Sequence, residues 1–204
     1  FDTALRIEAR WFTNVVMNPS SSAMIRSLFI SKGALEKGAA RPKDVPDQRV
    51  RTVGILGAGM MGAGIALVAA QADIKVVLVD QDQNAANKGK QYSEKYLTDG
   101  IKRGKISEKI KEKTLNLILA TDDYKKLTYA DLVIEAVFED TKVKSDVTKA
   151  AVEVIHKDCI FASNTSTLPI SELAKASKYP ENYIGIHFFS PVEKMLLVEI
   201  IKGK

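Results

Sequence analysis

The stretch Val53-Gly54-Ile55-Leu56-Gly57-Ala58-Gly59-Met60-Met61-Gly62 decides the fold of this chain. It runs from an apolar strand into a Gly-x-Gly-x-x-Gly turn, and the small apolar residues of 63–70 predict a helix that packs on a sheet. Such a turn brings backbone N–H groups and a helix N-terminus up to a pyrophosphate. Gly57 permits the tight turn, Gly59 leaves room for the phosphates, and Gly62 lets the helix approach the strand.

A second buried strand, Lys75-Val76-Val77-Leu78-Val79, ends in Asp80. Asp80 lies 18 residues after Gly62, close to the spacing of about 20 that is typical of the carboxylate binding the adenosine ribose. A carboxylate there repels a 2′-phosphate, and the following Gln81 and Asp82 supply no arginine, so the sequence favours NAD over NADP. The alternative is a glycine-rich turn and a surface aspartate in an unrelated α/β protein, but the order of strand, turn, helix, strand and acid disfavours it.

The length and composition of the chain limit the classes of protein to which it can belong. A chain of 204 residues with 46% hydrophobic and 27% charged content predicts one domain with its own core, plus an appendage. No apolar run is long enough to span a membrane, and residues 1–6 resemble the middle of a helix, not a secretory signal. The missing initiator Met and the end at Gly203-Lys204 predict a fragment of a longer polypeptide. The single cysteine, Cys159, indicates a reducing compartment and precedes an apolar run, which favours a small buried residue over a nucleophile.

The net charge of +5 raises the question of an anionic partner. The densest basic cluster is Lys102-Arg103-Gly104-Lys105, followed by Lys109, Lys111 and Lys113. Because basic residues elsewhere are mixed with acids, the cluster is explained either as a solvated helix face or as a surface that attracts a phosphorylated substrate. Nucleic-acid binding is disfavoured, since the chain lacks a stacking platform and a clustered basic face.

The first part of the chain, residues 1–49, is predicted to form short helices and a linker. Residues 3–30 have helical periodicity, broken at Asn18-Pro19, and Ser20 to Ser22 are predicted to cap the second helix. Residues 32–49 are rich in glycine, proline and charge and are predicted to be a linker. Two short amphipathic helices cannot form a core alone, so their apolar faces must dock on another part of the protein.

Residues 50–204 alternate between strands and helices, which predicts an α/β fold of the Rossmann type with a doubly wound, mostly parallel sheet. Beyond the first two strands, we expect strands at 117–120, 131–137, 160–163, 183–187 and 197–201, and helices at 84–102, 107–117, 141–155 and 169–176.

Ligands of such sheets bind beyond the carboxyl ends of the strands. These ends carry Asp80, the segment Glu135-Ala136-Val137-Phe138-Glu139, the segment Ser163-Asn164-Thr165-Ser166, and His187. We therefore expect these polar groups to converge on one crevice.

His187 and Glu199 form a candidate catalytic pair. Histidine is the side chain best suited to take a proton near neutral pH, and Glu199 lies 12 residues later. If the segments around Val192-Glu193-Lys194 pair as antiparallel strands, Glu199 lies opposite His187 and can accept its imidazole N–H. The alternatives are a structural histidine at a strand end and a solvent-facing glutamate on an edge strand.

The other reactive side chains are not expected to act as catalytic groups or metal ligands. His156 is expected to end a helix on the surface, complementing its dipole. With two histidines and one cysteine at unsuitable spacing, no metal site is expected. Ser163 and Ser166 have no adjacent base in sequence, which favours hydroxyl contacts to a ligand over nucleophilic catalysis.

The chain from Arg51 to its end resembles the 3-hydroxyacyl-CoA dehydrogenases. The resemblance is carried by Gly57–Ala66, Val79-Asp80-Gln81, Glu135–Glu139, Ser163–Ser166 and His187-Phe188-Phe189-Ser190-Pro191 leading to Glu199. It implies NAD-dependent oxidation of a (3S)-3-hydroxyacyl-CoA to a 3-ketoacyl-CoA. His187 would take the hydroxyl proton with Glu199 as its partner, and Ser166 would hold the substrate oxygen.

The resemblance also completes the expected site. The cofactor-binding residues are Gly57, Gly59, Met60, Met61, Gly62, Asp80, Ala136, Val137, Glu139, Lys144 and Asn164, and the substrate-binding residues are Ser166 and Ser190. Glu139 and Lys144 match positions that contact the nicotinamide end, while the region of Lys102 and Arg103 loosely matches the approach of the coenzyme A phosphates. Ser190 stands where monofunctional members usually carry asparagine and multifunctional members commonly carry serine.

The leading helices and linker resemble the segment between the enoyl-CoA hydratase and dehydrogenase domains of multifunctional fatty-acid oxidation proteins. The resemblance implies a following helical domain that this chain lacks, so we expect NAD binding with poor turnover. It also implies a thiolase partner, and a bacterial cytoplasm or a mitochondrial or peroxisomal matrix. The alternatives are a dehydrogenase of another small hydroxyacid, in which a lysine base is common, and a non-catalytic nucleotide-binding protein.

Overall fold

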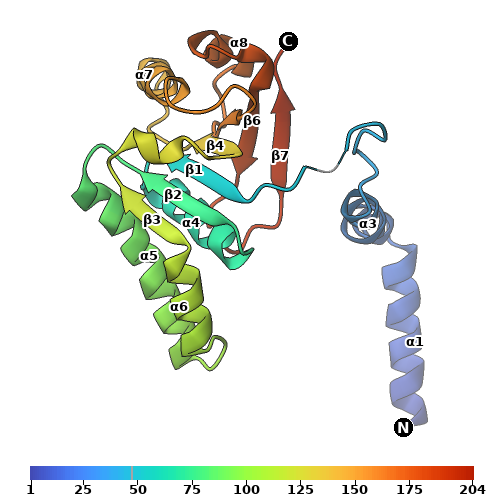
Figure 1. Cartoon of the computed structure of the whole chain (residues 1–204). Coiled ribbons are helices and arrows are strands. Elements are labelled where there is room, and N and C mark those ends of the chain that lie inside the picture. Colours follow the sequence, from blue (N-terminus) through green and yellow to red (C-terminus); the bar gives the residue numbers. More distant parts are fainter. Residues whose placement is uncertain (47) are drawn as a thin grey trace. The chain divides into compact units, whose positions relative to one another are not determined.

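The computed structural model describes residues 1–46 and 48–204 and divides the chain into two units, Phe1–Gln48 and Arg49–Lys204 (Figure 1). The first unit is helical, with α1 (Asp2–Met17), α2 (Pro19–Ile25), the π-helical η1 (Arg26–Ser31) and α3 (Lys32–Glu36). None of these helices has a buried residue. The apolar stripe of the first helix is accordingly exposed, as Phe12 at 68% shows.

Two expectations for this unit were wrong. The second helix is capped by Asn18, whose side chain accepts a hydrogen bond from Ser20 N, and not by Ser20 to Ser22. Pro19 is tolerated at the first helical position because an N–H group there has no intrahelical acceptor, so its absence costs no hydrogen bond. The helical conformation also continues to Glu36, so the predicted linker begins later than Lys32.

The second unit is built on a seven-stranded sheet with the order β3-β2-β1-β4-β5-β6-β7 (Figure 1). The first six strands are parallel to their neighbours and β7 is antiparallel to β6, which confirms the predicted fold class. The strands are β1 (Thr52–Leu56), β2 (Lys75–Val79), β3 (Ile118–Thr121), β4 (Leu132–Glu135), β5 (Ile160–Ser163), β6 (Tyr183–Phe188) and β7 (Val198–Lys202).

Alternate residues of each strand point to opposite faces of the sheet, and both faces are apolar. Helices therefore cover both faces. Val53 and Ile55 of β1 belong to one apolar cluster, which includes Ile65 of α4, whereas Leu56 belongs to a second cluster with Val152 of α7. The helices are α4 (Met60–Gln71), α5 (Gln83–Lys102), α6 (Glu108–Asn116), α7 (Thr141–Val152) and α8 (Ile170–Leu173), with short 3-10 turns η2 (Tyr124–Leu127), η3 (Ala174–Ala176) and η4 (Pro180–Asn182).

Local hydrogen bonds explain where elements begin and end. Asp82, Ser107 and Asp140 cap α5, α6 and α7 through their side chains. β4 ends at Glu135, two residues before its expected end, because the N–H of Val137 binds the Glu135 carboxylate instead of a neighbouring strand.

Further findings in the second unit concern His156, Cys159 and the basic cluster. The α7 helix ends at Val152, so His156 lies beyond it and does not end a helix as expected. Cys159 is buried, as predicted, and burial raises the pKa of its thiol to about 12. In the basic cluster, Lys111 pairs with Glu94 and Lys113 with Asp73. No helix in the described part of the chain is both long and apolar enough to cross a membrane.

Candidate active site

The glycine turn joins β1 to α4 at the point where the strand order reverses, between β1 and β4. Gly57 has a φ of +95°, which favours glycine. A Cβ on Gly62 would lie 1.8 Å from the Gly57 carbonyl oxygen, so a side chain there would push the helix off the strand. A Cβ on Gly59 would meet no atom within 4 Å. The turn therefore borders open space beside the first turn of α4, whose N–H groups have no intrahelical acceptor.

Asp80 follows β2 and lies beside this turn. Its carboxylate accepts hydrogen bonds from Ala58 N at 2.6 Å and from Gln81 N at 2.7 Å, which fixes its orientation. Asp80 borders a cavity of about 440 Å³, the Asp80 cavity. The cavity is lined by Gly57, Gly59, Val79, Asp80, Gln81, Tyr124, Ala136, Val137, Phe138, Val143 and Val147.

Sequence reasoning did not assign Tyr124, Phe138, Val143 and Val147 of this lining to the site. Tyr124 is half-buried, and burial followed by the neighbouring Asp80 charge raises the pKa of its phenol. Tyr124 comes three residues after β3. The rule that ligands bind beyond strand ends, applied to this strand as well, would have identified it.

A second cavity, the His187 cavity, has a volume of about 340 Å³. It is lined by Met61, Ala136, Val137, Glu139, Asn164, Ser166, His187, Phe188, Phe189 and Ser190. The structure thus brings together eight residues that the sequence predicted for the site, and Phe188 and Phe189 join them. Ala136 and Val137 line both cavities, so the two cavities share one wall.

His187 and Glu199 pair as the spacing predicted. They are directly opposite each other on the antiparallel strands β6 and β7, and Nδ1 of His187 lies 2.7 Å from Glu199 Oε2. The histidine side chain is 18% exposed, while the glutamate is 49% exposed. A carboxylate on Nδ1 fixes the tautomer that leaves the lone pair on Nε2. This geometry suits a base oriented by an acid.

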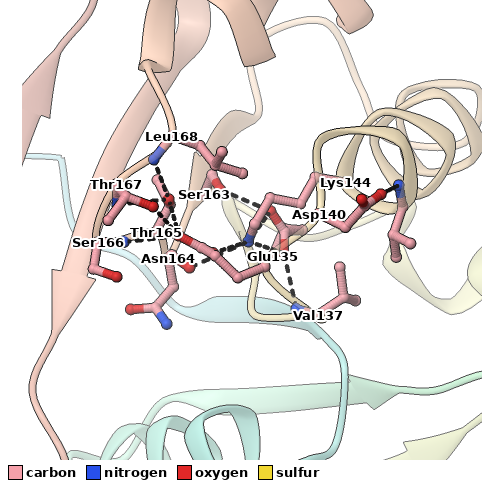
Figure 2. A network of polar contacts seen from close by, with 12 residues as sticks. Glu135, Val137, Asp140, Lys144, Ser163, Asn164, Thr165, Ser166, Thr167 and Leu168 are labelled. Carbon is pink, nitrogen blue, oxygen red and sulfur yellow. Dashed lines mark hydrogen bonds and ion pairs between the residues drawn. The ribbon is translucent and has the colours of Figure 1, made fainter.

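A buried polar network connects the ends of β4 and β5 (Figure 2). Glu135 and Lys144 have no exposed surface, and the Lys144 ammonium lies 2.8 and 3.1 Å from the two Glu135 carboxylate oxygens. Val137 N and the Ser163 hydroxyl donate to the same carboxylate, at 2.8 and 2.7 Å. Lys144 lines neither cavity, and its predicted contact with the cofactor stays a prediction.

Glu139 connects this network to the His187 cavity. Its carboxylate accepts hydrogen bonds from the Thr165 hydroxyl and from Ser166 N, and it lies 3.3 Å from the Lys144 ammonium. Partial burial alone would raise the pKa of Glu139, but the Thr165 hydroxyl and the Lys144 charge outweigh it and hold the pKa below its ordinary value of 4.5. A carboxylate at the edge of the cavity therefore stays ionised.

Asn164 joins the ends of three strands. Its N–H donates to the Glu135 carbonyl at 2.7 Å, and its side-chain oxygen accepts from Phe188 N at 2.9 Å. This contact fixes the main chain next to His187. Of the remaining predicted residues, Met60 is 69% exposed at the start of α4, and the Ser190 hydroxyl lies 3.9 Å from its sulfur.

Comparisons with known proteins agree with this geometry. Residues 52–204 match the family described as 3-hydroxyacyl-CoA dehydrogenase, NAD binding domain. The chain is 40% identical over 198 residues to the fatty acid oxidation complex subunit alpha of Shewanella halifaxensis, covering 97% of this chain but 28% of that protein. The chain therefore spans under a third of the length of this curated relative.

Two solved structures extend the comparison. An (S)-3-hydroxybutyryl-CoA dehydrogenase from Ralstonia eutropha is 39% identical with a TM-score of 0.74, over 76% of this chain and 55% of that one. A diketoreductase is 29% identical with a TM-score of 0.70, also over 76% and 55%. The glycine turn, the paired cavities and the family match lead to one conclusion: this chain belongs to the NAD-binding domain family of the 3-hydroxyacyl-CoA dehydrogenases.

Proposed function

We propose that this chain is the NAD-binding part of an enzyme that oxidises (3S)-3-hydroxyacyl-CoA to 3-ketoacyl-CoA in fatty-acid oxidation. The observation that carries this proposal is the His187–Glu199 pair, 2.7 Å apart, at a cavity that shares a wall with the Asp80 cavity. An extended dinucleotide spans two such cavities across the glycine turn.

The lining residues fit NAD in one orientation, with the adenosine in the Asp80 cavity and the nicotinamide in the His187 cavity. Asp80 would accept hydrogen bonds from the ribose hydroxyls of the adenosine, and the open space at Gly59 would accommodate the pyrophosphate next to the start of α4. The nicotinamide end would then occupy the His187 cavity, which Glu139 and Asn164 line. When bound there, NAD+ supplies the acceptor for the hydride that leaves carbon 3 of the substrate.

The chain's own side chains handle the proton and the orientation of the substrate. His187 takes the hydroxyl proton on Nε2, and the Glu199 carboxylate stabilises the imidazolium that forms. Ser166 and Ser190 line the same cavity and are placed to hold the substrate oxygen and its neighbours. Because a preorganised base and hydrogen-bond donors act on the same carbon, the site suits oxidation of a secondary alcohol.

Two observations support a role within a longer protein: the exposed helices of the first unit, and the fact that the chain covers only 28% of its Shewanella halifaxensis relative. We propose that the exposed apolar helices of residues 1–36 pack against an enoyl-CoA hydratase domain, and that a further helical domain closes over the acyl chain. A thiolase partner and a bacterial cytoplasmic location belong to the same proposal, supported by the fatty acid oxidation complex subunit of Shewanella halifaxensis and by the single free cysteine.

A second candidate function is oxidoreduction of a small hydroxy or keto compound without coenzyme A. The similarity to a diketoreductase that acts on dicarbonyl compounds, at 29% identity and a TM-score of 0.70, favours it. The exposed lysines near residues 102–113 favour the thioester instead, since they can attract the phosphates of coenzyme A.

Two measurements test the proposed function. Titration of this chain with NAD+ and NADP+ is expected to show tighter binding of NAD+, because Asp80 repels a 2′-phosphate. A substrate panel with the full-length protein is expected to show NADH formation from (3S)-3-hydroxyacyl-CoA and much less from the free hydroxyacid. The chain alone is expected to turn over the thioester poorly. Preference for the free acid would favour the second candidate.

A further inference from the structure

The pair formed by Glu135 and Lys144 is the most deeply buried ion pair in the described part of the chain, with both side chains at 0% exposure. Both Glu135 oxygens are fully engaged, one by Lys144 and Val137 N and the other by Lys144 and the Ser163 hydroxyl. The carboxylate is therefore fixed by donors from three directions and cannot rotate without breaking several hydrogen bonds.

The same ammonium also holds two groups at the edge of the His187 cavity. Its Nζ atom lies 3.3 Å from Glu139 Oε2 and 3.3 Å from the Asn164 carbonyl oxygen. Glu139 and Asn164 both line the cavity, whereas Glu135 and Lys144 do not. One buried charge thus links the core to two groups that a ligand in the cavity would meet.

Stability is a poor explanation for this arrangement. Removing two charges from water is costly, and well-packed neutral residues in place of a buried ion pair often leave stability unchanged or higher. What a neutral pair would lose is the fixed ammonium beside Glu139 and Asn164. The two carboxylates Glu135 and Glu139 share this one cation, so the cluster as a whole keeps a negative charge facing the cavity.

We propose that Glu135 and Lys144 are a positioning pair that holds the Glu139 carboxylate and the Asn164 main chain in place for the nicotinamide end of the cofactor. Neither side chain has exposed surface of its own. This inference rests on the proposed function, because it needs the nicotinamide to lie in the His187 cavity. Ser163 supports the same pair, because its hydroxyl donates a hydrogen bond to the Glu135 carboxylate.

The test compares two ligands that share the adenosine end. ADP carries the adenosine and both phosphates of NAD+ but lacks the nicotinamide riboside. The double variant Glu135→Gln/Lys144→Met of this chain removes both charges at nearly constant volume. By calorimetric titration, its affinity for NAD+ is expected to fall about tenfold or more, while its affinity for ADP stays within about twofold of wild type. Thermal unfolding is measured alongside.

A matched control is the exposed pair Lys178–Glu153, which lines neither cavity. The variant Glu153→Gln/Lys178→Met is expected to bind both ligands as the wild type does. If the buried double variant unfolds, the single variant Glu135→Gln, which keeps the size and a hydrogen-bond acceptor, is judged by the same two affinities.

Unchanged NAD+ affinity in a folded variant, or an equal loss for NAD+ and ADP, would overturn the positioning role. Failure of the wild type to bind NAD+ would instead contradict the proposed function, so the two failures are distinguishable.

Discussion

The two cavities of the site are built in different ways. The Asp80 cavity depends on one continuous stretch of backbone, the glycine turn, followed by a single carboxylate at the next strand end. The His187 cavity depends on side chains from the ends of β4, β5 and β6, held from behind by the buried network of Glu135, Lys144 and Ser163. Binding of the common part of the cofactor therefore needs mainly backbone shape, whereas the reacting end needs side chains fixed by tertiary contacts.

This difference predicts that binding and chemistry can be separated by mutation. Changes in the glycine turn should affect every adenine dinucleotide equally, because the turn provides space and N–H groups. Changes around His187 should affect turnover or the nicotinamide end alone.

The largest effect is expected for His187→Gln in the full-length protein. Glutamine keeps a polar side chain but cannot take a proton, so kcat should fall by about 10²–10⁴-fold, the usual contribution of a positioned general base. The affinity for NAD+ should change little, because adenosine and phosphates bind elsewhere. Steady-state kinetics and NAD+ titration check both. Turnover equal to the wild type would remove His187 from the mechanism.

The glycine turn offers a matched pair of substitutions. In Gly62→Ala the new methyl group collides with the Gly57 carbonyl, which lies 1.8 Å from the Cβ position, so stability should fall by about 1–3 kcal/mol. In Gly59→Ala the methyl group meets no protein atom within 4 Å, so stability should be nearly unchanged.

Both glycine variants should lose NAD+ affinity, but for different reasons: Gly62→Ala displaces the helix, and Gly59→Ala fills the space of the phosphates. Thermal unfolding and calorimetry on this chain separate the two. Normal NAD+ affinity in a stable Gly59→Ala variant would mean that the pyrophosphate does not lie at this turn.

The smallest effect concerns the pH dependence of stability. The pKa of Glu139 is lowered in the folded chain, through Thr165 and Lys144, despite its partial burial. Its contribution is therefore fully present above the ordinary carboxyl pKa and is lost as the pH falls through the lower, folded value. In Glu139→Gln, stability from urea unfolding should decline less between about pH 6 and pH 3 than in the wild type. Parallel declines would show that Glu139 is not held ionised.

The sequence predicts most of the fold because its signals are local. Short apolar runs separated by helical stretches predict the seven strands, and the 12-residue spacing, with antiparallel pairing, predicts that His187 lies opposite Glu199. The glycine turn and Asp80 were identified from one stretch of about 30 residues, which is the length of a βαβ unit.

The features that sequence reasoning did not foresee come from contacts that hydrophobic periodicity does not contain. Lys144 has the sequence of an exposed helical lysine, yet it is fully buried because Glu135, nine residues earlier, lies under the start of the same helix. Tyr124 enters the Asp80 cavity through a 3-10 turn that has no periodic signal. At residues 18–22, three serines and an asparagine compete to cap one helix, and Pro19 decides in favour of Asn18.

In the proposed complex, NAD has its adenosine at Asp80 and its nicotinamide at His187. A crystal structure of this chain with NAD+ bound is the decisive measurement. We expect the ribose hydroxyls of the adenosine on the Asp80 carboxylate, the pyrophosphate at Gly59, and the nicotinamide ring in the cavity lined by His187 and Glu139. A nicotinamide ring in the Asp80 cavity, or a dinucleotide bound away from the glycine turn, would contradict it.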